Sequence, residues 1–215
     1  MKTPSIWRSK FPWPFREVPL VTEIAGRIPR EADYHVNTSD NTLCLGSPLR
    51  LRQLLAEDPT LTGFASKCLV PYLFAQSRKL AGGGDYPFGE LAHGLPGMLD
   101  DYVALFGVKD FRQAVEALRL LGMKKRRANK LRCPCGCKKR LGRCRFNATL
   151  AQFRKVASRP WFRAEREAIL EVARQIAERA KQSKTSQNLS APKASVSLKN
   201  CYISQPGKAS MSIVL

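Results

Sequence analysis

Apolar residues recur at three- and four-residue spacing through most of the chain after residue 47, a pattern typical of amphipathic helices. Ser47 followed by Pro48 predicts a capped helix start, because serine accepts a hydrogen bond from the first turn and proline fits there. Further helices are predicted over residues 59–79, 95–106, 110–128, 148–157 and 161–181. Pro71 is expected to kink or split the first of these, since it lacks a backbone N–H.

The helix predicted over residues 110–128 should begin at Asp110, whose carboxylate can cap the first turn. One apolar face of this helix comprises Phe111, Val115, Leu118 and Leu121. The last predicted helix carries a narrower apolar stripe, made of Ala168, Ile169, Val172, Ala173, Ile176 and Ala180.

The N-terminal part has a different pattern. Residues 18–28 alternate loosely between polar and apolar types and include β-branched side chains, which favours a strand. Residues 37–41 are typical of a turn, and residues 42–45 follow as a second short strand. The predicted fold class is therefore α+β, with a few strands in the N-terminal part followed by helices.

Charge divides the chain into three regions. Residues 1–107 hold 11 basic and 11 acidic residues, whereas residues 108–182 hold 22 basic and 6 acidic residues, a net charge of +16. Residues 183–215 add 4 basic residues and no acidic ones, and their Ser- and Lys-rich composition predicts a disordered tail. A neutral part joined to a basic part suggests two tasks. The basic part, above all residues 124–145, could bind nucleic acid phosphates or an acidic protein surface.

Hydropathy bears on the compartment. Mean hydropathy is −0.28, and no apolar run approaches the roughly 18 residues that would span a bilayer, so no membrane association is expected. The first residues lack the apolar core of a signal peptide, and a cytoplasmic protein is expected.

Four of the seven cysteines lie within twelve residues, at Cys133, Cys135, Cys137 and Cys144. Zinc binds about four thiolate or imidazole ligands in a tetrahedron, and Gly136 allows the tight turn that would bring the first thiols together. Catalytic zinc usually keeps a water position and a His or carboxylate ligand, and the two histidines are far away in sequence. The cluster predicts a structural zinc ion as the cofactor, with a reduced, metal-free loop as the alternative.

The segment Cys133-Pro-Cys135-Gly-Cys137-Lys-Lys-Arg-Leu-Gly-Arg-Cys144-Arg145 resembles the SEC-C zinc motif, written Cys-Pro-Cys-Gly-Ser-Gly-Lys-Lys-x-x-x-Cys-Cys/His. The resemblance implies zinc ligands at Cys133, Cys135 and Cys144. The fourth ligand of the family falls on Arg145, which cannot bind zinc, whereas its serine falls on Cys137, which can. Cys137 is therefore expected to supply the fourth ligand.

A second group of chemically reactive residue types comprises His35, Asn37 and Cys44. A cysteine thiolate can accept an acyl group, and an amide such as that of Asn37 can stabilise the tetrahedral oxyanion. Cys44 also lies between two leucines, so a buried structural cysteine is the alternative.

This group resembles the His-Pro-Asn motif and acceptor cysteine of ubiquitin-conjugating enzymes. The aromatic and proline-rich residues 11–15 are similar to the stretch before that motif, and residues 86–94 with the SEC-C-like segment resemble bacterial members found in anti-phage defence operons. The resemblance implies a partial, N-terminally shortened ubiquitin-conjugating-like part over residues 1–107. It also implies Cys44 as thioester acceptor, with Asn37 and His35 beside it, and a ubiquitin-like or cyclase C-terminus as partner.

Two functions of different classes follow. One is conjugation of a ubiquitin-like protein by acyl transfer through Cys44. The other is a non-enzymatic module over residues 108–182, with its zinc motif at 131–147, that binds nucleic acid or an acidic protein. In that module Trp161 and Phe162 could stack on bases or anchor a helix to the core. A scaffold with a zinc-stabilised C-terminal subdomain is the third reading.

Overall fold

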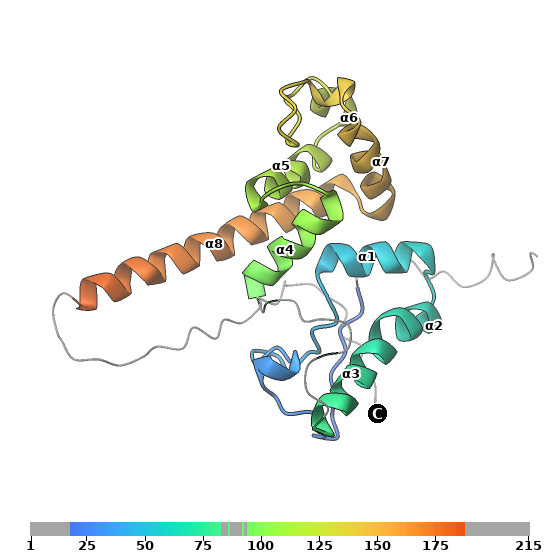
Figure 1. Ribbon diagram of the computed structural model, residues 1–215, viewed down its shortest axis with the longest axis vertical. Coiled ribbons are helices and arrows are strands. Elements are labelled where there is room, and N and C mark those ends of the chain that lie inside the picture. Colours follow the sequence, from blue (N-terminus) through green and yellow to red (C-terminus); the bar gives the residue numbers. More distant parts are fainter. Residues whose placement is uncertain (1–17, 83–85, 87–91, 93, 188–215) are drawn as a thin grey trace, which may run out of the picture.

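The computed structural model describes residues 18–82, 86, 92 and 94–187 (Figure 1). The aromatic and proline-rich residues 11–15, most of the segment 86–94 and the predicted tail from residue 188 onward lie outside the described residues. The last helix continues to Gln187, so the first five residues of the predicted tail are helical.

Regular structure in the described residues is helical. In chain order the elements are η1 (Ala32–Tyr34), α1 (Pro48–Glu57), α2 (Leu61–Phe64), the π-helical η2 (Ala65–Leu69), α3 (Val70–Leu80), α4 (Gly94–Phe106), α5 (Phe111–Leu121), α6 (Lys125–Ala128), η3 (Leu141–Arg143), α7 (Phe146–Val156) and α8 (Arg159–Gln187).

The predicted α+β class, with a ubiquitin-conjugating-like N-terminal part, is wrong. Within the described ranges, extended residues meet only at single antiparallel bridges, Thr22–Thr42, Val36–Leu43 and Arg132–Arg140, and no sheet forms. Pro19, which lacks an N–H, and Gly26, which turns the backbone to φ +69°, bound the segment around Thr22, and the described residues between them form isolated bridges and no ladder. The alternation seen in the sequence therefore belongs to a loop.

The helices α1 and α2 begin close to the positions that the sequence predicts. Ser47 caps α1 by accepting a hydrogen bond from the N–H of Arg50, which confirms the predicted helix start. Residues 61–80 form one continuous helical path through α2, η2 and α3. Pro71 is accommodated by a π-turn, in which the N–H of Val70 donates to the carbonyl of Ala65, five residues back.

Two clusters of buried apolar residues hold the described part together, and α1 contributes to both. The N-terminal cluster comprises Val21, Ile28, Val36, Leu43, Leu51, Leu55, Phe64, Cys68, Leu69 and Tyr72. The C-terminal cluster joins Leu49 of α1 to α4, α5, α7, α8 and the cysteine loop, and includes Tyr102, Phe106, Leu118, Leu121, Leu141, Leu150 and Phe162. Figure 1 shows the far end of α8 running beyond the other helices.

The predicted helix over 110–128 is divided in two. Asp110 caps α5 by accepting a hydrogen bond from the N–H of Gln113, as expected. The helix stops at Leu121, since Gly122 has low helix propensity and Lys124, with ψ 130°, departs from the helical conformation, and α6 starts afresh at Lys125. Phe111 does not share the buried face of α5, which begins at Ala114; its side chain is 53% exposed.

Candidate metal centre and basic surface

The four clustered cysteines lie on a short hairpin and the turn that follows it. The hairpin closes through the Arg132–Arg140 bridge, a 2.9 Å bond from the N–H of Cys133 to the carbonyl of Lys139, and a 2.8 Å bond from Leu141 to Leu131. At its tip Gly136 has φ +82°, a conformation that glycine adopts without strain. Residues 131–141 are therefore folded by backbone bonds of their own.

Cys144 reaches the hairpin because η3 turns the chain back. Leu141, at the start of η3, is fully buried, and the N–H of Cys144 donates to its carbonyl over 3.0 Å. Phe146 then begins α7 and is also buried. Two apolar anchors thus flank Cys144 and fix its direction.

The structure brings the four predicted sulfur atoms together. All four Sγ atoms lie within 4.8 Å of one another. The separations are 3.2 Å for Cys133–Cys135, 3.6 Å for Cys135–Cys144 and 3.5 Å for Cys137–Cys144. A zinc ion about 2.3 Å from four tetrahedral thiolates sets the sulfurs about 3.8 Å apart, so only small shifts would admit it. The arrangement can hold one metal ion.

Backbone N–H groups stabilise negative charge at this cluster. Those of Cys135, Lys139 and Phe146 donate to the sulfurs of Cys133, Cys137 and Cys144 respectively. The bond from Phe146 lowers the pKa of Cys144 to about 7, whereas burial raises the pKa of Cys133. Arg145, where the SEC-C pattern places a ligand, is exposed and precedes α7.

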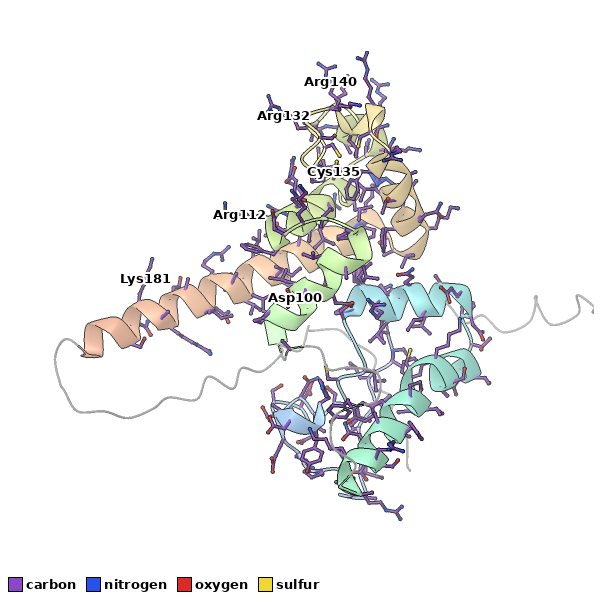
Figure 2. All side chains as sticks on the ribbon, in the orientation of Figure 1. Asp100, Arg112, Arg132, Cys135, Arg140 and Lys181 are labelled. Carbon is purple, nitrogen blue, oxygen red and sulfur yellow. The ribbon has the colours of Figure 1, made fainter. Side chains whose placement is uncertain are left out.

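Basic side chains surround the cysteine loop. Between Glu116 and Glu165 the chain has 16 basic and no acidic residues. Eleven of them are exposed and form what we call the basic surface: Lys124, Lys125, Arg126, Arg127, Lys130, Arg132, Lys138, Lys139, Arg140, Arg143 and Arg145. Figure 2 shows Arg132 and Arg140 projecting outward from the loop that holds Cys135. Within the described residues, none of these eleven side chains has an ion-pair or hydrogen-bond partner.

The basic surface is also free of large exposed apolar side chains. The exposed large hydrophobic residues of the described chain are Ile24, Leu61, Val70, Phe74, Leu80, Phe111 and Ile176, and none falls within residues 124–145. The surface therefore offers charge and hydrogen-bond donors without an apolar centre.

His35, Asn37 and Cys44 lie close together on the segment 35–44, where backbone bonds join its two ends and the Asn37 side chain bonds within it. The N–H of Cys44 donates to the carbonyl of His35 over 2.7 Å. The side-chain amide of Asn37 donates to Oγ1 of Thr42 over 2.8 Å, within the same turn. Cys44 keeps solvent contact, yet crowding by protein atoms raises the pKa of its thiol, against a hydrogen bond from Gly46. The acyl-transfer role of these residues stays a prediction.

The two aromatic residues after Pro160 have different surroundings. Phe162 is fully buried in the C-terminal cluster, so it anchors α8 and is not available for stacking on bases. Trp161 is half-buried, and the guanidinium of Arg52 lies 4.7 Å from its ring centroid. Sequence reasoning assigned Phe111 to an apolar helix face, whereas the structure leaves it exposed beside basic residues.

Comparisons with protein families, with curated proteins and with solved structures find no match to this chain. The resemblances to the SEC-C motif and to ubiquitin-conjugating enzymes accordingly rest on the residues that carry them. None of the helices in the described ranges is both long and apolar enough to cross a membrane.

Proposed function

We propose that this protein is a nucleic-acid-binding module whose basic surface is held in place by one structural zinc ion. The observation that carries the proposal is the concentration of eleven exposed, unpartnered cationic side chains around a four-sulfur site in the described part of the chain. The metal would fix the loop, and the loop would present the charges.

Zinc is the metal that suits this donor set best. Four thiolates in a tetrahedron are a common structural zinc site, and a closed site of this kind leaves no position for a catalytic water. The surrounding arginines and lysines would offset the net negative charge of a tetrathiolate zinc complex. Small metal sites of this type often supply the folding energy of their own loop.

A phosphate backbone fits the basic surface better than an acidic protein does. Stable protein–protein interfaces have a core enriched in aromatic and apolar residues and depleted of charge, surrounded by a polar rim. Residues 124–145 expose charges throughout and no large apolar side chain. Such a surface suits a nucleic acid, whose phosphates contact the cationic side chains and release their counterions on binding.

Conjugation of a ubiquitin-like protein through Cys44, in anti-phage defence, remains the second candidate. The described residues form no sheet of the kind that the resemblance implied, and Asn37 is engaged with Thr42. These observations favour nucleic-acid binding over conjugation, and the reactivity of the Cys44 thiol would distinguish the two.

The test of the binding function is affinity for a short DNA or RNA duplex across a salt series. Each phosphate contact contributes a slope of about 0.9 in log affinity against log salt. The triple substitution Lys125→Ala, Arg126→Ala and Arg127→Ala should weaken binding to all sequences alike and reduce that slope. The buried Ala128, which anchors α6, is left in place.

A matched control removes three exposed charges from the neutral part of the chain. Arg27→Ala, Arg30→Ala and Arg78→Ala together should leave both affinity and slope unchanged. A poly-glutamate chain serves as an acidic polymer without phosphates. Binding of poly-glutamate as tight as that of the duplex, or duplex binding that ignores salt, would overturn the proposal.

A further inference from the structure

The start of α5 combines an exposed aromatic ring with positive charge. Phe111 is the first residue of the helix and is 53% exposed, and Lys109 and Arg112 on either side of it are exposed too. The guanidinium carbon of Arg112 lies 5.9 Å from the centroid of the Phe111 ring. A single exposed apolar residue is common on protein surfaces and does not by itself indicate a binding site. Phe111, however, lies within the basic half of the chain, close to cationic side chains.

This helix start is rigid and lies beside the cysteine loop. Asp110 caps it through a 2.9 Å bond from the N–H of Gln113, and the N–H of Lys109 donates to Oε1 of Gln113 over 3.0 Å. A Cβ placed on Gly136, at the tip of the hairpin, would lie 3.7 Å from Nε2 of Gln113. Gln113, which bonds the residues around Phe111, therefore lies close to the tip of the cysteine hairpin.

The ring has the features of a base-stacking platform. An aromatic ring that is held on a rigid helix and flanked by cations can stack on a base while the cations contact phosphates. The bases of a duplex are covered by their neighbours, so only an unpaired base offers a free face. The Asp110 carboxylate already occupies the N-terminus of α5, so phosphates would be held by basic side chains and not by the N–H groups of the helix start.

We infer that Phe111 is a stacking site for an unpaired base, and that the preferred ligand of the basic surface is single-stranded nucleic acid. The inference rests on the proposed function and narrows its ligand from polyanions in general to strands with accessible bases. Phosphate contacts of the basic surface supply affinity for any strand, and Phe111 supplies the additional affinity for one with unpaired bases.

Three probes of equal length separate these contributions: single-stranded oligothymidylate, an abasic strand with the same backbone, and a duplex. Phe111→Ala should weaken oligothymidylate binding by about 5- to 150-fold, the range that loss of one stacked base produces. It should leave the abasic strand and the duplex within about twofold of the original protein, because neither offers a free base. Phe111→Trp should retain or improve oligothymidylate binding.

Phe74→Ala is the matched control, since Phe74 is 49% exposed but lies on α3, outside the basic half. It should change binding of none of the three probes. Equal weakening of all three probes by Phe111→Ala, or no effect on oligothymidylate, would overturn the stacking inference while the triple α6 variant still tests the basic surface. Failure of the unmodified protein to bind any probe at low salt would overturn the proposed function together with the inference.

Discussion

The hydroxyl of Tyr102 donates a 2.6 Å hydrogen bond to Oε1 of Glu165 and accepts the N–H of Leu49 over 3.3 Å. Tyr102 belongs to α4, Glu165 to α8 and Leu49 to the first turn of α1, and all three residues are buried. Nearby, Ser47, the N-cap of α1, and Arg50 of α1 donate to the buried carboxylate of Asp101 on α4. Directional polar contacts therefore fix how α1 sits against the C-terminal helices.

Removing the Tyr102 hydroxyl should destabilise the protein without altering its shape. Tyr102→Phe deprives Glu165 of a donor and the Leu49 N–H of its acceptor inside the protein, a loss of about 1–3 kcal/mol in the free energy of unfolding. Urea denaturation measures this value. Ser77→Ala is the control, because the Ser77 hydroxyl bonds the carbonyl of Phe74 at the surface, and its removal should cost about 0.5 kcal/mol or less. Equal losses for both variants would contradict the role of the Tyr102 contact.

The four-cysteine site should hold one zinc ion per chain after purification without chelators. Cys135→Ser should reduce the zinc content to near zero, because serine is a poor zinc ligand in a closed thiolate site. Elemental analysis of the pure protein gives the stoichiometry, and Cys44→Ser, which alters an exposed thiol outside the cluster, should leave it unchanged.

Cys137 provides a sharper test of the same site. Its sulfur lies 3.5 Å from that of Cys144, although the SEC-C pattern has serine at its position. If Cys137 is the fourth ligand, Cys137→Ser should weaken zinc affinity as much as Cys135→Ser does. Full zinc retention by Cys137→Ser would assign the fourth position to another group.

Truncation of two phenylalanines should lower stability to very different extents. Phe162→Ala removes a fully buried ring and should cost about 3–5 kcal/mol of stability. Phe111→Ala removes a ring that is 53% exposed and should cost well under about 1 kcal/mol. Thermal or urea unfolding of the two variants checks this, and a large loss for Phe111→Ala would place its ring in the core.

The thiol of Cys44 should react slowly with alkylating reagents near neutral pH. Crowding raises its pKa above the ordinary value of 9.0, so less thiolate is present than for a free cysteine, and the rate should rise with pH beyond that value. Iodoacetamide labelling followed by mass spectrometry measures the rate, with the denatured chain as reference. Labelling faster than that of the denatured chain at neutral pH would instead favour the acyl-acceptor role.

The clustering of the four cysteines could be predicted from sequence because these residues and their turn are local. Cys133, Cys135 and Cys137 lie on one hairpin, Cys144 follows in the next turn, and Gly136 marks the tip at which positive φ is needed. The helix starts at Ser47 and Asp110 were predictable for the same reason, since each cap bonds to a residue three positions ahead. Interactions between residues so close in sequence can be predicted from residue type and spacing alone.

The incorrect predictions, a strand over residues 18–28 and a buried Phe111, both depend on which other segment packs beside the residue. Alternation over residues 18–28 is compatible with a strand, but a strand needs a neighbour, and the described chain supplies only single bridges there. Helical periodicity placed Phe111 on the same face as Leu118, yet periodicity does not reveal where packing along a helix begins. The charge of the sequence predicted the basic surface, whereas the exposure of the Phe111 ring beside it could be known only from the structure.

The position of α1 between two clusters has an energetic consequence. Leu49 and Leu51 are two residues apart, so they point to different sides of the helix, one into the C-terminal cluster and the other into the N-terminal cluster. Melting α1 would expose both clusters at once, so the described helices should unfold as a single cooperative unit. An ion bound at the cysteines would then slow amide hydrogen exchange as far away as Phe64, and a ligand on one half of the molecule would stabilise the other half without touching it.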